Sequence, residues 1–307
     1  MNADTEQKYL ACPVCESAVR SWRVKNVGAT SYNIDLCRAC GFAFVNPRPS
    51  FSFLMEYYTS FGHRNSNTAR EAVPTLASVL RHEKSYANST IDAARLVQTV
   101  GRLFGDTRGR KFLDVGCGYG FFSRAALDAG FDVSALELAK NEREIATEMT
   151  GLDPAACSFE EFQTPTASLS VVLMSQILEH ALDVNLWVQK ARSFLANDGI
   201  LAIALPNYGS IFRMVLQANE PYITPPEHLN FFNPASLSHL LERHGFRVEH
   251  VQWVSRIPSR SFERRIPAFG KPILPAVTAL ASAAMKIVDA LRLGMIINVY
   301  ARKMPTR

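Results

Sequence analysis

The stretch from Lys111 to Phe122, KFLDVGCGYGFF, joins a short apolar run to three glycines spaced G-x-G-x-G. A second apolar run, Phe131 to Leu136, follows and ends at Glu137. Glycines after an apolar strand let the backbone approach a ligand closely, and an acid at the tip of the next strand can accept hydrogen bonds from two ribose hydroxyls. The sequence therefore predicts an α/β domain with a nucleoside-binding site at this turn.

The spacing of the glycines distinguishes between two kinds of nucleoside. A dinucleotide fingerprint, G-x-G-x-x-G, requires glycine at the position that Phe121 occupies. The spacing found here, preceded by Asp114, resembles motif I of the class I S-adenosylmethionine (SAM)-dependent methyltransferases. In that family the turn faces the methionine part of SAM, the motif I acid lies near its amino group, and the second-strand acid holds the ribose. The resemblance implies these roles for the glycines Gly116, Gly118 and Gly120, for Asp114, and for Glu137.

Five further positions complete the cofactor set that the resemblance implies. Cys117 lies inside the glycine turn and is expected to be a small buried side chain. Leu138 follows the second-strand acid. Ser158 and Phe159 occupy the place where the family contacts adenine, although many relatives have Asp where Ser158 stands. Gln176 follows a later strand, at the edge where open α/β sheets bind ligands, and is expected to line the cofactor pocket.

Beyond Glu137 the chain keeps alternating helical and strand patterns, which favours a mostly parallel sheet covered on both faces. A third strand is expected at residues 155–158 and a buried fourth strand at 169–174. The last two strands are expected at 246–254 and 295–301, and the resemblance implies that the final one is antiparallel. The expected fold class is α/β, with a seven-stranded Rossmann-like class I methyltransferase sheet, a small N-terminal zinc ribbon and a helical cap.

Two histidines are the candidates for catalysis. His180 ends the run SQILEH, whose E-H pair resembles the end of motif IV in one branch of the family, and it can take a proton from a hydroxyl, phenol or carbon acid near neutral pH. A helix-capping or pocket-lining histidine is the alternative. His228 lies in the run PPEHLNFF, which is typical of this branch and is expected to form a lid over the acceptor. It would be a second base or an orienting group, with a polar cap for the helix at Ser236 as the alternative.

The N-terminal cysteines form two C-x-x-C pairs, Cys12 with Cys15 and Cys37 with Cys40. Each pair can place two thiolates on one metal ion, and four thiolates complete a tetrahedral zinc site with no open position for catalysis. A redox C-x-x-C would not come twice, and disulfides are disfavoured in a cytoplasmic chain. The run CGFAFVNPRP that begins at Cys40 resembles the end of the zinc ribbon found in a mostly bacterial branch of SAM methyltransferases. We therefore expect a structural Zn²⁺.

The resemblance divides the chain into a zinc ribbon at residues 1–50, a helical linker or cap at 51–108 and a methyltransferase domain at 109–307. That domain would carry an acceptor lid at about 206–235 and an insert at about 255–294. The start of the cap holds Tyr57, Tyr58 and His63. An aromatic here can touch SAM, and packing at a domain interface explains these residues equally well.

Composition permits this interpretation without requiring it. The chain has 307 residues, 48% of them hydrophobic and 20% charged, which is ordinary for a soluble globular protein. The N-terminus lacks the apolar region of a signal peptide, so we expect a cytoplasmic protein. The apolar stretch 273–297 is interrupted by Lys286, Asp289 and Arg292, so no membrane span is expected. Residues 255–307 hold ten Lys or Arg against two acids. We interpret them as a solvated face, with binding of phosphate, anionic membrane or nucleic acid as alternatives.

The expected function is methyl transfer from SAM to a small-molecule acceptor, with oxygen preferred over carbon or nitrogen. A natural product, sugar or quinone-like phenol would fit. A nucleic-acid methyltransferase is the weaker alternative, because the ribbon holds few basic residues and the chain has no N-P-P-Y motif. A non-catalytic SAM-binding module is the third hypothesis. The sequence leaves the acceptor and the oligomeric state open.

Overall fold

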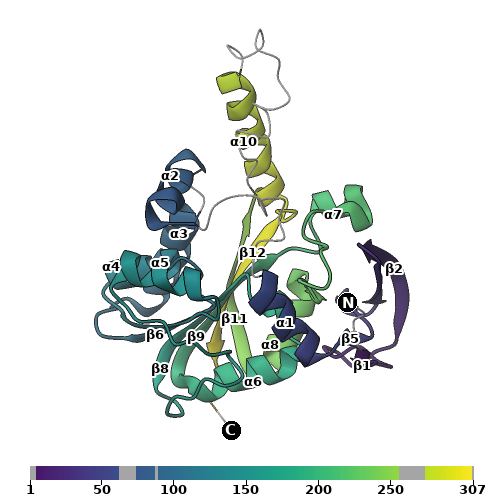
Figure 1. Cartoon of the computed structure of the whole chain (residues 1–307), viewed down its shortest axis with the longest axis horizontal. Coiled ribbons are helices and arrows are strands. Elements are labelled where there is room, and N and C mark those ends of the chain that lie inside the picture. The colour runs from purple at the N-terminus through teal and green to yellow at the C-terminus, as the bar shows by residue number, and fades with distance from the viewer. Residues whose placement is uncertain (1–4, 62–73, 87–88, 256–273, 306–307) are drawn as a thin grey trace.

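The computed structural model describes residues 5–61, 74–86, 89–255 and 274–305. A six-stranded sheet lies at its centre, in the order β11-β12-β9-β8-β6-β7 (Figure 1). The strands are β6 (Lys111–Val115), β7 (Asp132–Leu136), β8 (Leu169–Ser175), β9 (Leu195–Pro206), β11 (Phe246–Val254) and β12 (Ile296–Lys303). Strands β7, β6, β8 and β9 run parallel, whereas β12 is antiparallel to both of its neighbours. The α/β fold class and the antiparallel final strand are therefore confirmed.

The third strand of the expected seven is reduced to one bridge beside β7. Ala155 pairs in parallel with Leu136, its N–H donates to the carbonyl of Ala135 at 2.9 Å, and its carbonyl accepts from Glu137 at 3.1 Å. Three residues later in the chain, the backbone N–H of Ser158 donates to the carboxylate of Glu161 at 3.1 Å. The strand order of a seven-stranded sheet is therefore present, but the expected third strand is a single bridge and does not count as a strand.

Both faces of the sheet are covered by helices, because successive strand residues point to opposite sides. On one face Leu113 and Val172 belong to the core that includes α6 and α8, and on the other Phe112 and Val171 belong to the core that includes α3 and α4. The helices are α1 (Phe51–Phe61), α2 (Leu76–Tyr86), α3 (Ser89–Phe104), α4 (Phe121–Asp128), α5 (Lys140–Thr150), α6 (Val184–Phe194), α7 (Ile211–Leu216), α8 (Pro234–Arg243) and α10 (Leu274–Ala290), with short 3₁₀ turns η2 (Leu178–His180) and η3 (Gln217–Asn219). Burial on both faces explains the continuous apolar runs in β8 and β9.

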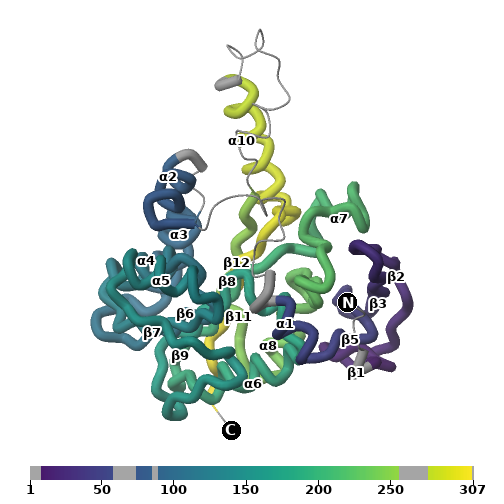
Figure 2. Tube along the Cα trace, in the orientation of Figure 1, coloured from purple at the N-terminus to yellow at the C-terminus, as the bar shows by residue number. Residues whose placement is uncertain are grey.

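A second sheet, in the order β10-β4-β3-β2, forms most of the N-terminal ribbon. Its strands are β2 (Val19–Val27), β3 (Thr30–Cys37), β4 (Ala43–Val45) and β10 (Asn230–Phe231), and a small separate pair joins β1 (Thr5–Gln7) to β5 (Arg48–Pro49). Strand β10 comes from the C-terminal half of the chain, and Asn230 pairs with Phe44 of β4. In Figure 2 the purple ribbon accordingly lies beside the green segments of the C-terminal half. The ribbon is therefore joined to the segment that contains His228 by main-chain hydrogen bonds.

Helix α10 stands away from the rest of the molecule (Figure 1). Its Leu280 and Ile287 are 75% and 62% exposed. Within the described ranges, no helix combines the length and the apolar character that crossing a bilayer requires. Helix α10 is part of the expected insert at 255–294, of which residues 256–273 lie outside the described part, as do His63 and the side chain of Tyr58.

Candidate active site

The glycine turn after β6 has the backbone that its residues predict. Gly116, Gly118 and Gly120 have φ values of +68°, +53° and +84°, in the left-handed region that glycine adopts at little cost. At Gly116 an added Cβ would lie 2.9 Å from Cδ1 of Ile177. Gly120 caps the N-terminus of α4. The turn therefore presents bare backbone at the carboxyl ends of the parallel strands, where such folds bind ligands.

Two buried carboxylates lie at this turn. Glu137 follows β7, and its two oxygens accept hydrogen bonds from the backbone N–H groups of Gly118 and Ala139, both at 2.9 Å. Asp114 is only 1% exposed and accepts a 2.7 Å hydrogen bond from the Ser123 hydroxyl. Burial is the main cause that raises the pKa of Asp114 to about 6, and the charge of Glu137 adds to it while Ser123 opposes it. A cation near Asp114 would therefore stabilise its charged form.

A cavity lies over the glycine turn and brings together five of the ten predicted cofactor residues. It encloses about 130 Å³ and opens to solvent. The predicted residues in its lining are Gly116, Glu137, Leu138, Ser158 and Phe159. Asp114, Gly118 and Gly120 belong to the strand and turn beside it. Cys117 instead packs with Ala135 and Ala146, and burial raises its pKa well above the ordinary value, so it remains a neutral thiol.

Several residues of this cavity were not predicted from the sequence. Helix α1 contributes Phe51, Leu54 and Met55, and Ile177 and Trp187 lie farther along the chain. The indole N–H of Trp187 donates to Oε1 of Glu160 at 2.7 Å, and its ring packs against Phe159. Apolar residues of this kind usually pack in cores, so only the tertiary structure identifies them as part of a site.

A second cavity of about 390 Å³ lies on the other side of the end of β8. Its lining comes from several elements and comprises Ser89, Asp92, Leu96, Phe122, Ser175, Gln176, Ala204, Tyr222, Val254, Met295, Ile296 and Asn298. Gln176, which the sequence predicted to line the cofactor pocket, lies in the lining of this second cavity. The next residue, Ile177, lines the first cavity instead. Gln176 also has a φ of +55°, a conformation that costs about 1–3 kcal/mol outside glycine and is often found at functional sites.

The two predicted catalytic histidines meet between the cavities. The rings of His180 and His228 lie edge to face, with centroids 4.9 Å apart. His180 lines the first cavity, and the ring of Tyr222, which lines the second, stacks on His228 with centroids 6.5 Å apart. One ligand atom of Glu179 and one of each histidine all lie within 4.8 Å of one another. The pair is therefore accessible from the first cavity and adjacent to the second.

Hydrogen bonds determine which nitrogen of each ring is protonated in its neutral form. Nδ1 of His180 lies 2.7 Å from the carbonyl of Glu227, and Nδ1 of His228 lies 2.7 Å from the carbonyl of Tyr222. A carbonyl only accepts, so each Nδ1 carries the proton and each Nε2 keeps a lone pair.

Neither histidine acts as a helix cap. The helix α8, which contains Ser236, is capped by Asn233 in a capping box, and α6 is capped by Asp183. The capping alternatives raised for His180 and His228 are thereby excluded, because both helix N-termini already have their own acceptors.

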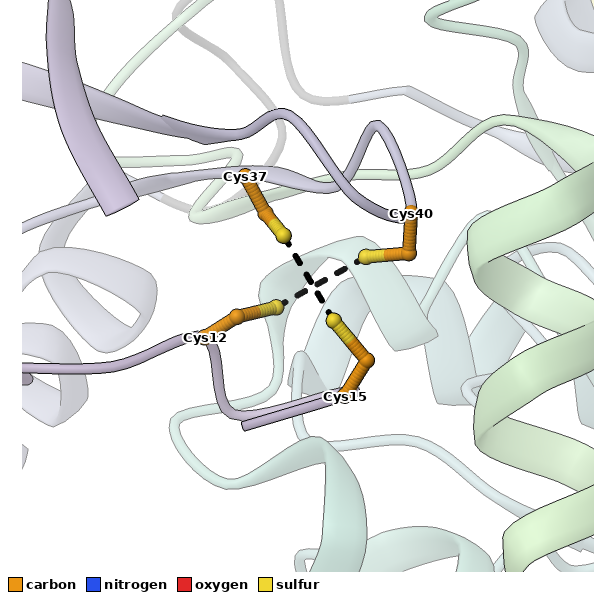
Figure 3. Close-up of side chains that lie close together, drawn as sticks. All are labelled: Cys12, Cys15, Cys37 and Cys40. Atoms are coloured by element: carbon orange, nitrogen blue, oxygen red, sulfur yellow. Dashed lines mark hydrogen bonds between the residues drawn. The ribbon is translucent and has the colours of Figure 1, made fainter. Parts of the chain in front are cut away.

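The four N-terminal cysteines point at a common centre (Figure 3). The Sγ atoms of Cys12 and Cys40 are 3.7 Å apart, and those of Cys15 and Cys37 are 3.5 Å apart. All four are free thiols whose sulfur atoms lie within 4.8 Å of one another. A tetrahedral zinc ion with Zn–S bonds of about 2.3 Å would need sulfur atoms about 3.8 Å apart. The cluster therefore has the donor type, number and spacing of a four-thiolate metal site.

Comparison with known sequences gives consistent matches. A family profile described as a methyltransferase domain matches residues 87–251, which is more than half of the chain. A probable S-adenosylmethionine-dependent methyltransferase of Mycolicibacterium smegmatis is 28% identical over 142 residues, covering 46% of this chain and 53% of that protein. The ubiquinone biosynthesis O-methyltransferase of Bordetella avium is 33% identical over 110 residues, covering 34% of this chain and 45% of that protein. The matched part thus spans about half the length of these curated relatives.

A solved structure resembles nearly the whole chain. It is the Burkholderia thailandensis 1,6-didemethyltoxoflavin-N1-methyltransferase with bound 1,6-didemethyltoxoflavin and S-adenosylhomocysteine, with a TM-score of 0.53 over 92% of this chain and 100% of that one. The identity is 15%, so the likeness concerns the fold. These matches show that the chain belongs to the methyltransferase-domain family, and the glycine turn, the two acids and the order of the sheet agree with its fold.

Proposed function

We propose that the protein transfers the methyl group of SAM to a hydroxyl oxygen of a small molecule. The observation that carries this proposal is the position of His180, His228 and Tyr222 between two cavities at the carboxyl ends of the parallel strands. In this proposal the first cavity holds SAM and the second holds the acceptor. SAM supplies a methyl group that its sulfonium already makes electrophilic, so the protein has to align the acceptor and exclude water.

The two acids at the glycine turn have complementary roles in this proposal. Glu137 is held by the N–H groups of Gly118 and Ala139 and lines the first cavity, a position suited to accepting hydrogen bonds from ribose hydroxyls. Asp114 is buried behind the turn, and its carboxylate would be stabilised by the ammonium group of the methionine part. Gly116 keeps the backbone free of side chains where the ligand enters.

The histidine pair would remove the proton of the acceptor hydroxyl. Each ring donates from Nδ1 to a carbonyl, so Nε2 is the atom that accepts a proton. The buried carboxylate of Glu179 lies close enough to both rings to stabilise the imidazolium that forms. The oxygen of the acceptor, relieved of its proton, then attacks the methyl group. Alignment supplies much of the rate in such reactions, so base catalysis is one contribution among several.

The acceptor class is supported by the second cavity and by the relatives. Among the described residues that line this cavity, Asp92 is the one charged residue, and its carboxylate is paired with Arg95 at 3.0 Å. Gln176, Tyr222 and Asn298 add polar side chains. A cavity lined by uncharged polar side chains and a paired carboxylate has no cation to hold an anionic acceptor, so it favours an uncharged one that forms hydrogen bonds. Ubiquinone biosynthesis O-methyltransferases are among the similar proteins, which supports oxygen as the methylated atom. We therefore propose an uncharged phenol of the quinone type.

We further propose that Cys12, Cys15, Cys37 and Cys40 hold a structural Zn²⁺. Their spacing supports this, and with four protein ligands there is no position for a catalytic water. We keep the division into a ribbon at 1–50, a helical cap at 51–108 and a methyltransferase domain at 109–307, with one addition. Strand β10 of the lid belongs structurally to the ribbon sheet.

The proposal is tested first by calorimetric titration with SAM. Wild-type protein should bind SAM, Glu137→Ala should bind it much more weakly, and Asp132→Ala should bind it as the wild type does. Asp132 is a matched control because it is an exposed acid at the opposite end of the same strand, β7. If the folded wild type does not bind SAM, the proposal fails.

The acceptor is tested by incubating the protein with SAM and a panel of phenols, and by measuring S-adenosylhomocysteine. S-adenosylhomocysteine should form in the presence of uncharged phenols, and less of it should form with their carboxylated counterparts. Tyr222→Phe should change the KM for the phenol and leave SAM binding intact, because Tyr222 lines only the second cavity. If S-adenosylhomocysteine formed with oligonucleotides and with none of the phenols, the small-molecule assignment would be wrong.

A further inference from the structure

We infer that Arg48 and Asn230 are positioning residues, through which the four-cysteine ribbon holds His180 and His228 in their catalytic arrangement. The inference rests on the proposed role of the two histidines. It assigns the ribbon a function in the methyl-transfer step that is separate from SAM binding. Arg48 lies just after the second cysteine pair in the sequence, and Asn230 lies two residues after His228.

Asn230 ties the turn that carries His180 to the lid segment that carries His228. Its amide nitrogen, Nδ2, donates to the carbonyl of Ala181 at 2.7 Å and faces those of Glu179 and Leu178 at 3.2 and 3.3 Å. These three carbonyls belong to η2 and the residue after it, so they surround His180. The side chain is 2% exposed, so water cannot replace these donors.

Arg48 holds the other end of the same amide. Its Nη2 donates to Oδ1 of Asn230 at 2.6 Å, and its Nη1 donates to the carbonyl of Leu229 at 2.8 Å. The orientation of the amide is therefore unambiguous, because a guanidinium only donates and a carbonyl only accepts. Arg48 is 2% exposed, and burial lowers its pKa to about 10, so it keeps its charge at neutral pH.

The same lid segment is paired directly with the ribbon. The backbone N–H of Val45, in β4, donates to the carbonyl of Leu229 at 2.9 Å, so that carbonyl accepts from both β4 and Arg48. The N–H of Leu229 donates in turn to the carbonyl of Glu179 at 2.8 Å. Hydrogen bonds thus run continuously from the ribbon to the residue that precedes His180.

The second cysteine pair anchors the start of this connection. Cys37 ends β3, its N–H donates to the carbonyl of Phe42 at 2.9 Å, and its carbonyl accepts from Gly41 at 2.9 Å, so the cysteine turn leads directly into β4. The first pair is held to the core as well, because Asn185 donates to the carbonyl of Pro13 at 2.9 Å. A metal ion that joins the two pairs would therefore set the position of β4 relative to the core.

The histidine rings depend on this frame for their orientation. Nδ1 of His180 donates to the carbonyl of Glu227, which is in the lid segment, so a movement of the lid relative to η2 would change the placement of both rings together. Misplacement of a reacting group by about 1 Å can reduce a rate about 100-fold. SAM binding should be affected far less than the rate, because His180 is one of many residues that line the first cavity and neither Arg48 nor Asn230 is among them.

The decisive variant is Asn230→Asp. It retains an acceptor for Arg48 and strengthens that contact to an ion pair, but it replaces the donor that faces three carbonyls. We expect kcat to fall about 100-fold, with SAM affinity by calorimetry falling far less. In NMR spectra of the histidine rings, the chemical shifts and titration midpoints of His180 and His228 should change. Arg48→Met should act in the same direction, and Arg48→Lys, which keeps the charge, should restore part of the rate.

Two matched substitutions on the exposed surface of β2 serve as controls. Asn26→Asp and Arg20→Met make the same chemical changes at exposed positions of the ribbon, and should leave the ring spectra and the rate unchanged. Folding of every variant is checked by circular dichroism and thermal unfolding.

Two results would overturn the inference. In the first, Asn230→Asp and Arg48→Met fold and show wild-type ring spectra. In the second, SAM affinity falls as much as the rate, which would mean that the ribbon supports the cofactor cavity. The ring spectra and the calorimetry require no acceptor, so they distinguish failure of this inference from failure of the proposed function, in which the wild type itself would not bind SAM.

Discussion

The imidazole rings of His180 and His228 meet edge to face, with an angle of 83° between their planes. The first ring comes from the turn after β8, and the second comes from the segment that leads into β10. Each ring has its Nδ1 bonded to a backbone carbonyl of the lid. The two histidines therefore form one unit, and their chemistry should respond to substitution as a unit.

Replacing either histidine by asparagine should reduce kcat by about 100-fold while SAM binding persists, because a positioned base contributes about 10²–10⁴-fold to such a rate. The double variant should lose little more than the single ones, since residues that act together are not additive. Steady-state kinetics with S-adenosylhomocysteine detection measures this. His239→Asn, on the exposed side of α8, is the control. If the fold-loss in kcat of the double variant equalled the product of the two single losses, the histidines would act independently, contrary to this prediction.

The buried acid Asp114 should make the protein less stable as pH rises from about 4 to about 6. Its folded-state pKa of about 6 lies above its ordinary value of 3.8, so the folded state binds more protons in that window and the unfolding free energy falls. At pH 7.5, ionisation of Asp114 lowers the unfolding free energy by about 3 kcal/mol relative to its value at low pH. Asp114→Asn lacks this titration. Urea unfolding of both proteins at pH 4 and 7.5 should therefore show the wild type losing about 3 kcal/mol relative to the variant. An unchanged difference would contradict the buried-acid explanation.

Removal of the metal proposed for the cysteine cluster should destabilise the ribbon and its junction with β10. Cys37→Ser or treatment with a strong chelator should lower the unfolding free energy by about 4 kcal/mol or more, because the four thiols lose the ion that joins them. Elemental analysis of the wild type should find about one zinc per chain. Cys157→Ala changes a cysteine outside the cluster and should keep the metal. A metal-free wild type with full stability would disprove the zinc assignment.

Two glycines of the turn should differ in how well they tolerate alanine. Both Gly116 and Gly118 have positive φ, so either substitution incurs backbone strain of about 1–2 kcal/mol. At Gly116 the new Cβ would also meet Ile177 at 2.9 Å, whereas at Gly118 nothing lies within 4 Å. Gly116→Ala should therefore be the more destabilising change by urea unfolding, and it should weaken SAM binding because Gly116 and Ile177 both line the first cavity. Gly105→Ala is the control, because Gly105 has a φ of +84° and nothing lies within 4 Å of an added Cβ. Its loss of unfolding free energy therefore measures backbone strain alone. Equal losses at all three sites would mean that Ile177 moves aside freely.

Local residue patterns were sufficient for the parts of this protein that depend on backbone conformation and strand ends. The three glycines and Asp114 predicted the turn after β6, and the acid at Glu137 predicted the tip of β7, because a strand end and a positive φ leave strong signals in a few consecutive residues. The two C-x-x-C pairs likewise predicted the four-thiol cluster, since each pair acts within one turn.

The tertiary structure decided which distant residues meet. The pairing of β10 with β4, and the contact of Arg48 with Asn230, join segments about 180 residues apart, and no local pattern records such a partner. The position of Gln176 was also not predictable from local patterns, because its backbone has a φ of +55° that places it beside the second cavity. The sequence by itself determined the cofactor turn, the sheet and the thiol cluster, which follow from local conformation and periodicity. The two cavities and the histidine unit between them arise from long-range packing, so only the folded chain defined them.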